Sequence, residues 1–170
     1  MPRSLQINRS ATRNNKQVMD TSYLMQSIER AKNYHSQLIV VIGKYASQLL
    51  EQAVSTNDLF EINLSLELSE RLIDIPKQAR SKLVSTIFSD LLNEQQTKVL
   101  LLNHIEILFD QTLLIDPLRL LQSSAKNLTL VIAWPGDKST SSLNYAIPSH
   151  PEYRSYKVSE FGETIFVEAD

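Results

Sequence analysis

Short apolar runs, separated by stretches with helical periodicity, most limit the folds open to this chain. Nearly all the residues of Leu38–Ile42, Lys98–Asn103 and Leu128–Trp134 are apolar. Runs of this length without polar alternation are typical of strands buried on both faces of a sheet. The segment Leu59–Leu66 alternates in part and predicts a further strand. Four strands are therefore expected.

Helical patterns fill the segments between these strands. Apolar residues recur at helical spacing from Tyr23 to Asn33 and from Tyr45 to Val54, and the longest pattern runs from Pro76 to Leu92. Asp116 and Pro117 predict the start of another helix. This alternation predicts an α/β fold with three layers and a mostly parallel sheet, in which Leu59–Leu66 lies towards an edge. We expect a polar loop at 137–142, followed by turns and one or two edge strands.

The chain has 170 residues, which suits one domain with a substantial core. Its first twenty residues hold four basic residues and one acidic residue, with little apolar content. They predict a disordered basic tail over 1–22, followed by a domain over 23–170. The longest apolar run, Leu38–Ile42, is too short to span a membrane. We therefore expect a cytoplasmic protein without a membrane partner. Because the chain has no Cys, thiol catalysis and Cys-ligated metals are excluded.

Glycine is scarce: the chain has only Gly43, Gly136 and Gly162. Neither an intact G-x-x-x-x-G-K-[ST] loop nor an intact G-x-G-x-x-G loop can be present. Gly43 and Lys44 nevertheless follow a predicted strand and open a helix that contains Ser47, where a phosphate-binding loop would lie. Two interpretations stay open. One is a strand that ends in Gly beside an exposed Lys; the other is residual nucleotide binding at a degenerate Walker A site.

The segment 100–106 resembles a Walker B strand, in which an Asp at the strand end binds magnesium. Asn103 occupies that position, and an amide without charge would hold magnesium weakly at best. Gly43, Lys44, Ser47 and Asn103 are thus the candidate nucleotide-binding residues. Glu106 is the candidate catalytic residue, although acidic residues on a helix surface more often only solvate a turn. The three His residues are far apart in sequence, and no metal site is expected.

Several uncommon strings occur in one order over residues 38–157: LELSERL at 66–72, LLLNHIEILFD at 100–110, DPLRLLQ at 116–122 and VIAWPG at 131–136. Tyr145-Ala146, HPEY at 150–153 and Tyr156 follow. The chain thereby resembles the small P-loop protein, the F component, of type 3 bacteriophage-exclusion (BREX) systems. The resemblance implies an AAA-like P-loop NTPase fold in an intracellular bacterial protein. Its partners would be the other operon products: a large ATPase, a methyltransferase and a phosphatase-like protein.

Gly43-Lys44 and Asn103 stand where this family has a glycine-rich Walker A loop and an Asp. We therefore expect an assembly or binding module of a phage-defence complex, with lost or weak ATPase activity and at most weak binding of ATP and magnesium. One alternative is a divergent active ATPase that uses Lys44, Ser47 and Glu106. Another is a DNA-binding accessory protein, which would use the tail and the basic residues Arg71, Lys77, Arg80 and Lys82. The net charge of −2 argues against tight non-specific DNA binding.

The expected contacts are with other proteins, with DNA reached through them, and with a second copy as a further possibility. The segment 137–156 contains Tyr145, Tyr153, Arg154 and Tyr156, the residue types that dominate protein interfaces. The alternative is that these tyrosines cover the edge of the sheet.

Overall fold

A computed structural model describes residues 19–170. Its helices are α1 (Ser22–Ala31), α2 (Ala46–Asn57), α3 (Leu64–Leu72), α4 (Lys77–Glu94) and α5 (Pro117–Ser124). Its strands are β1 (Leu38–Ile42), β2 (Phe60–Asn63), β3 (Val99–Asn103), β4 (Thr129–Ala133), β5 (Asp137–Lys138), β6 (Ser142–Tyr145), β7 (Arg154–Lys157) and β8 (Ile165–Glu168). Short 3-10 helices are η1 (Glu106–Phe109), η2 (Gln111–Leu113) and η3 (Val158–Phe161).

The main sheet has five parallel strands in the order β2-β3-β4-β1-β8. Every residue of β1 and β4 is buried, as continuous apolar runs require. The predicted α/β class with a mostly parallel sheet is therefore confirmed. The predicted order of strands is also confirmed, because β1, β3 and β4 are central and β2 lies at an edge.

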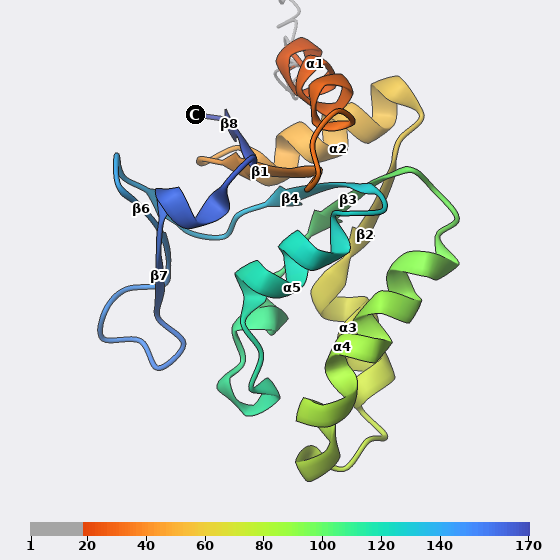
Figure 1. Cartoon of the computed structure of the whole chain (residues 1–170), viewed down its shortest axis with the longest axis vertical. Coiled ribbons are helices and arrows are strands. Elements are labelled where there is room, and N and C mark those ends of the chain that lie inside the picture. Colours follow the sequence, from red (N-terminus) through yellow and green to blue (C-terminus); the bar gives the residue numbers. More distant parts are fainter. Residues whose placement is uncertain (1–18) are drawn as a thin grey trace, which may run out of the picture.

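Helices cover both faces of this sheet (Figure 1). Successive side chains of a strand point to opposite faces, so β1 contributes to two apolar cores. Val40 packs in one core with residues of α3, α4 and α5, whereas Ile39 and Val41 pack in the other with α1 and α2. This arrangement is a three-layer one, with the sheet between two sets of helices.

The predicted strand Leu59–Leu66 is wrong in its second half. The strand ends at Asn63, whose side chain accepts a hydrogen bond from the backbone N–H of Leu66 at 3.0 Å and caps α3. Leu64 and Leu68 are then buried one helical turn apart. The leucines of this segment fit both periodicities, and the capping side chain decides between them.

A second sheet follows β4, where the sequence predicts a polar loop over 137–142. The strands β5, β6 and β7 form an antiparallel sheet, in which Asp137 pairs with Asn144 and Ser142 pairs with Lys157. The loop prediction therefore holds only for residues 139–141. From residue 142 on, the sequence predicts one or two edge strands, whereas the structure has β6, β7 and β8, because short and mostly polar strands carry little hydrophobic pattern.

Residues 1–18, most of the predicted basic tail, lie outside the described residues. The proposed boundary between tail and domain therefore stays a prediction. Within residues 19–170, every helix is too short or too polar to cross a bilayer.

Candidate functional site

The five strands of the main sheet are parallel, so their carboxyl ends meet along one edge, where α/β proteins usually bind ligands. A pocket of about 520 Å³ opens there at the ends of β1 and β4. Lys44 and Ser47 line it after β1, Trp134 and Lys138 line it after β4, and Asp170, which follows β8, lies beside Lys44. The structure thus brings three of the predicted site residues, Gly43 among them, to a single pocket.

Gly43 has a backbone φ of +119°, which side-chain-bearing residues rarely adopt. A Cβ at this position would lie 2.7 Å from the backbone oxygen of Ala169 and against the carboxylate of Asp170. The glycine is therefore required because the end of the chain passes over it. The close approach of Ala169 and Asp170 is enough to explain why glycine occupies this position, without a bound phosphate.

Backbone N–H groups that follow β1 are already used. The N–H of Tyr45 donates to the backbone oxygen of Ala169 at 2.8 Å, and the N–H of Lys44 donates to Asp170 Oδ1 at 3.4 Å. Only three residues separate Ile42, the last residue of β1, from Ala46, the first of α2. A phosphate-binding loop needs a longer connection whose N–H groups point inward. This connection has neither the length nor free donors for that role.

The charges around the pocket nearly cancel. Lys44 is exposed, and its Nζ lies 5.1 Å from the centre of the Tyr45 ring. Lys138 Nζ lies 3.4 Å from Glu168 Oε1, and the carboxylates of Asp137 and Asp170 lie at the same pocket. A site for a nucleotide triphosphate requires an excess of positive charge. The pocket does not have this excess.

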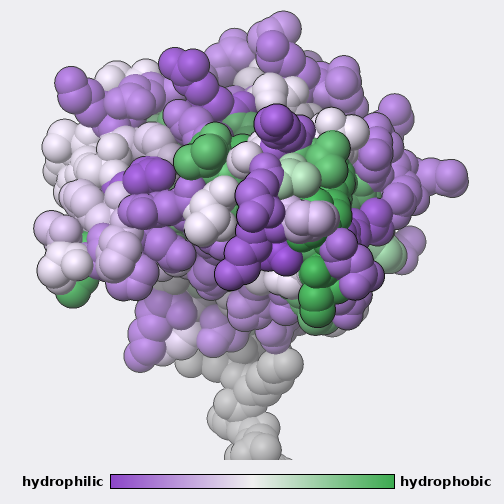
Figure 2. All heavy atoms as spheres, turned by 90° about the horizontal axis from the view of Figure 1, so that it is seen from below, coloured by the Kyte–Doolittle hydropathy of each residue, from purple (hydrophilic) through white to green (hydrophobic). Residues whose placement is uncertain are grey.

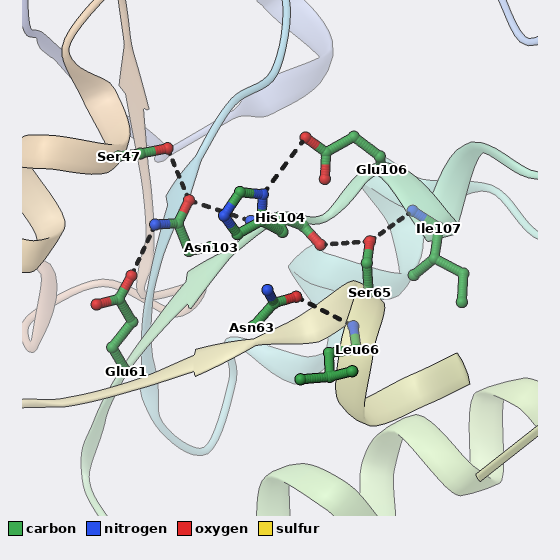
Figure 3. Close-up of polar contacts among 9 residues, drawn as sticks. All are labelled: Ser47, Glu61, Asn63, Ser65, Leu66, Asn103, His104, Glu106 and Ile107. Atoms are coloured by element: carbon green, nitrogen blue, oxygen red, sulfur yellow. Dashed lines mark hydrogen bonds and ion pairs between the residues drawn. The ribbon is translucent and has the colours of Figure 1, made fainter. Parts of the chain in front are cut away.

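Asn103 is the centre of a polar network at the end of β3 (Figure 3). Its side chain is 5% exposed. Its Oδ1 accepts hydrogen bonds from Ser47 Oγ at 2.8 Å and from the backbone N–H of His104 at 3.1 Å. Its Nδ2 donates to Glu61 Oε1 at 2.8 Å. Ser47 and Asn103, predicted as a pair from their positions in the sequence, are therefore in direct contact.

An amide oxygen has two lone pairs, and both acceptor positions of Asn103 Oδ1 are occupied by protein donors. Magnesium would have to displace one of them and would gain a ligand without charge. The residues at this strand end therefore do not fit a magnesium ion. Within residues 19–170, no group of three or more acidic or His side chains is placed to hold a metal.

Glu61 is the polar residue that sequence reasoning missed. It lies on β2 and is half-buried, and this burial raises the pKa of its carboxyl, although the hydrogen bond from Asn103 opposes the shift. The signal in the sequence is weak: one acidic residue between Phe60 and Ile62 in a predicted strand. Because the residue sits on the neighbouring strand, its contact with Asn103 depends on the order of strands.

The carboxylate of Glu106 points toward the side chain of His104 and not toward Asn103 (Figure 3). It lies on η1, with Oε1 4.0 Å from His104 Nδ1, and its side chain is 44% exposed. Within the described residues it contacts neither Ser47 nor Asn103 (Figure 3). The backbone carbonyl of His104 accepts a hydrogen bond from Ser65 Oγ at 2.6 Å. Ser65 Oγ in turn accepts the backbone N–H of Ile107 at 3.2 Å. The structure thus separates the candidate catalytic residue from the candidate nucleotide-binding residues.

We expect Glu61→Gln to stabilise the protein slightly at neutral pH, by less than about 1 kcal/mol because the group is partly solvated. Gln keeps an acceptor for Asn103 and removes a charge whose burial is unfavourable. Since the pKa of Glu61 is raised in the folded state, the wild type loses stability as pH rises through that pKa. The advantage of the variant should therefore grow with pH. Urea denaturation at acidic and neutral pH, with Glu70→Gln on the exposed face of α3 as control, measures it. A less stable variant at neutral pH would contradict this interpretation.

Comparisons with protein-family models, curated proteins and solved structures give no match for this chain. The resemblance to the phage-exclusion family rests on the sequence strings alone.

Proposed function

We propose that this chain is a subunit of a bacterial phage-exclusion complex, in which a P-loop-like domain serves assembly and does not hydrolyse ATP. The order of strands supports the P-loop-like fold. β4 lies between β1 and β3, as in P-loop proteins that insert a strand at this place. The chemistry at the strand ends supports the absence of turnover.

The hydrogen bond between Ser47 and Asn103 carries this proposal. In an active site of this class, a Ser or Thr at the first helix and an Asp at the third strand hold magnesium between them. Here the two side chains bond directly to each other at 2.8 Å, and the Asp is replaced by a neutral amide that also binds Glu61. The pair is part of the packing between α2 and β3. This arrangement suits a domain that keeps the fold of an ATPase and uses its surface to bind other proteins.

The divergent ATPase is the less favoured alternative. It would need Glu106 near the phosphates, where it could orient water. Glu106 lies instead beside His104, at the partly exposed start of the 3-10 helix η1.

The DNA-binding alternative relies on the basic tail, most of which lies outside the described residues, and on a second basic stretch that is partly engaged within the protein. Arg71 forms two hydrogen bonds with Glu94, at 3.0 and 2.7 Å, and Arg80 donates to the backbone oxygen of Ile75 at 2.9 Å. Two of the four basic side chains are thus less available to a phosphate backbone. Contacts with DNA through partner proteins are the simpler possibility.

Two tyrosines of the candidate contact surface at 137–156 are packed inside the protein and are not free to contact a partner. Tyr156 is buried, with its ring 6.2 Å from that of Trp134, and Tyr145 stacks on Phe109 at 3.8 Å. These two residues therefore cover the sheet, as the alternative interpretation holds. The part of the candidate contact surface that can contact a partner is the connection from β6 to β7. In it, Ile147 is 66% exposed and Tyr153 is partly exposed.

Other exposed apolar side chains lie outside this connection. On the face seen from below Figure 1, apolar surface appears in separate areas between hydrophilic atoms (Figure 2). Ile73, at the end of α3, is 71% exposed and provides a matched control for Ile147.

We expect Ile147→Ser combined with Tyr153→Ala to reduce recovery of partner proteins from cells that express the whole operon. The apolar and aromatic contacts of an interface centre are lost on such changes. Affinity purification followed by protein identification measures recovery, and phage resistance of the same cells measures function. Ile73→Ser should retain both. Each variant is first compared with the wild type by thermal unfolding. If the double variant folds normally and keeps every partner and full resistance, the connection is not the interface.

A further inference from the structure

The strand β8 ends the main sheet with a free edge. Within residues 19–170, its one pairing partner is β1. The N–H of Ala169 donates to the backbone oxygen of Ile42 at 2.7 Å, and its C=O accepts from Tyr45, so the backbone of Ala169 faces β1. Bonding residues alternate along a parallel strand. Phe166 and Glu168 therefore direct their N–H and C=O groups away from β1, to the unpaired side.

A groove runs along this free edge. It has a volume of about 500 Å³ and lies between β8 and α1, which contacts β8. The consecutive residues 162–166 line one wall of the groove. Residues 162–164 belong to the turn before β8, and Ile165 and Phe166 are the first two residues of the strand, so the groove meets the free edge where β8 begins. In Figure 1, α1 lies next to β8 at this end of the sheet.

The other wall carries a cation between two aromatic rings. Tyr23, Arg30 and Tyr34 line the groove; Tyr23 and Arg30 are seven residues apart on one face of α1, and Tyr34 lies in the turn after it. Within residues 19–170, Arg30 forms no ion pair with a carboxylate. The nearby carboxylate of Glu163 is used by the backbone, since it accepts the N–H of His35 at 2.9 Å and that of Ser36 at 3.4 Å.

We propose that an extended peptide segment of a partner protein adds to the free edge of β8, with an acidic side chain bound by Arg30. Backbone groups of Phe166 and Glu168 supply the hydrogen bonds of a new strand, which is a common mode of peptide recognition. The guanidinium of Arg30, which has no carboxylate partner within residues 19–170, selects a carboxylate, which it can bind with two parallel hydrogen bonds. The strand itself has no Pro and no Lys to protect its edge.

A partner peptide fits this edge better than a second copy of the chain. Glu163, Glu168 and Asp170 lie on or beside β8, so a second β8 strand would bring acidic groups near their own counterparts. Lys138 compensates Glu168 within one molecule, at 3.4 Å. This inference goes beyond the proposed function, because it concerns another surface and states the chemistry of its occupant. It can be tested on the isolated chain.

The probe is a short capped peptide of alternating Val and Thr with one central Glu, compared with the same peptide carrying Gln. Titrated into the full-length chain, the Glu peptide should shift the backbone amide resonances of Phe166 and Glu168. Its Kd should be about tenfold lower than that of the Gln peptide. Arg30→Gln should remove this difference by weakening only the Glu peptide. Arg119→Gln, at an arginine whose side chain is 87% exposed on α5, should leave both affinities unchanged.

A Glu peptide that is N-methylated at alternate residues cannot pair as a strand and should not bind. Equal binding of the methylated peptide, or an equal effect of Arg30→Gln and Arg119→Gln, would overturn the proposal. So would the absence of shifts at Phe166 and Glu168 on titration of the Glu peptide. Shifts at these residues that depend on protein concentration alone would assign the edge to a second copy and contradict the proposed occupant. None of these outcomes bears on recovery of operon partners through Ile147 and Tyr153.

Discussion

Replacing Leu101 by Ala is expected to lower the free energy of unfolding by about 2–5 kcal/mol, the range for removing a large apolar side chain from a core. Leu101 lies in the middle of β3, beside Glu61 on β2 and Val131 on β4, and it is fully buried. Its neighbours belong to the core that α1 and α2 share with the sheet. The rigid sheet around it leaves little freedom to close the cavity.

Urea denaturation of the Leu101→Ala protein measures this loss. Leu114→Ala is the control, because Leu114 is 80% exposed and its truncation should change the free energy of unfolding by less than about 0.5 kcal/mol. Similar losses in the two variants would show that β3 is not a central, buried strand.

Gly43→Ala is the second change with a large expected effect, a loss of about 3 kcal/mol in the free energy of unfolding. Two causes combine: a φ of +119° that is strained for Ala, and a new Cβ only 2.7 Å from the backbone oxygen of Ala169. Because that oxygen belongs to the backbone, a simple change of rotamer cannot relieve the clash. The end of the chain must move away from Lys44 and Tyr45.

Gly162→Ala separates the two causes. Gly162 also has a positive φ, of +56°, but a Cβ there would have no neighbour within 4 Å. Its replacement should therefore cost only the strain of its backbone conformation, about 1–2 kcal/mol. Thermal and urea unfolding of the two variants give the comparison. If the two glycines are equally sensitive, the close approach of Ala169 to Gly43 does not contribute to stability.

The parts of the fold that the sequence predicts are those with a strong local pattern. The apolar runs of β1, β3 and β4 can only be stable in the middle of a covered sheet, so their central positions follow from composition alone. The boundary between β2 and α3 at Asn63 does not follow from composition, because the leucines on both sides of it fit a strand as well as a helix. The polar strands β5 to β7 show no hydrophobic alternation and are specified by tertiary pairing.

In the candidate site, too, local sequence patterns predict one contact and do not indicate another. Ser47 and Asn103 follow their strands at positions that predict proximity, and the structure places them 2.8 Å apart. The contact of Asp170 with Gly43 joins residues far apart in the chain, and no local pattern indicates it. A glycine after a strand is therefore an ambiguous signal: it is equally compatible with a bound phosphate and with a crossing segment of the same chain.

The most direct test of the central claim, a P-loop-like domain without turnover, is calorimetric titration of the isolated chain with ATP, with and without magnesium. We expect no binding tighter than about 1 mM in either condition. The connection after β1 is too short for a phosphate, and both lone pairs of Asn103 Oδ1 are occupied. Magnesium-dependent binding in the micromolar range, abolished by Lys44→Ala and accompanied by hydrolysis that Glu106→Gln removes, would contradict the account.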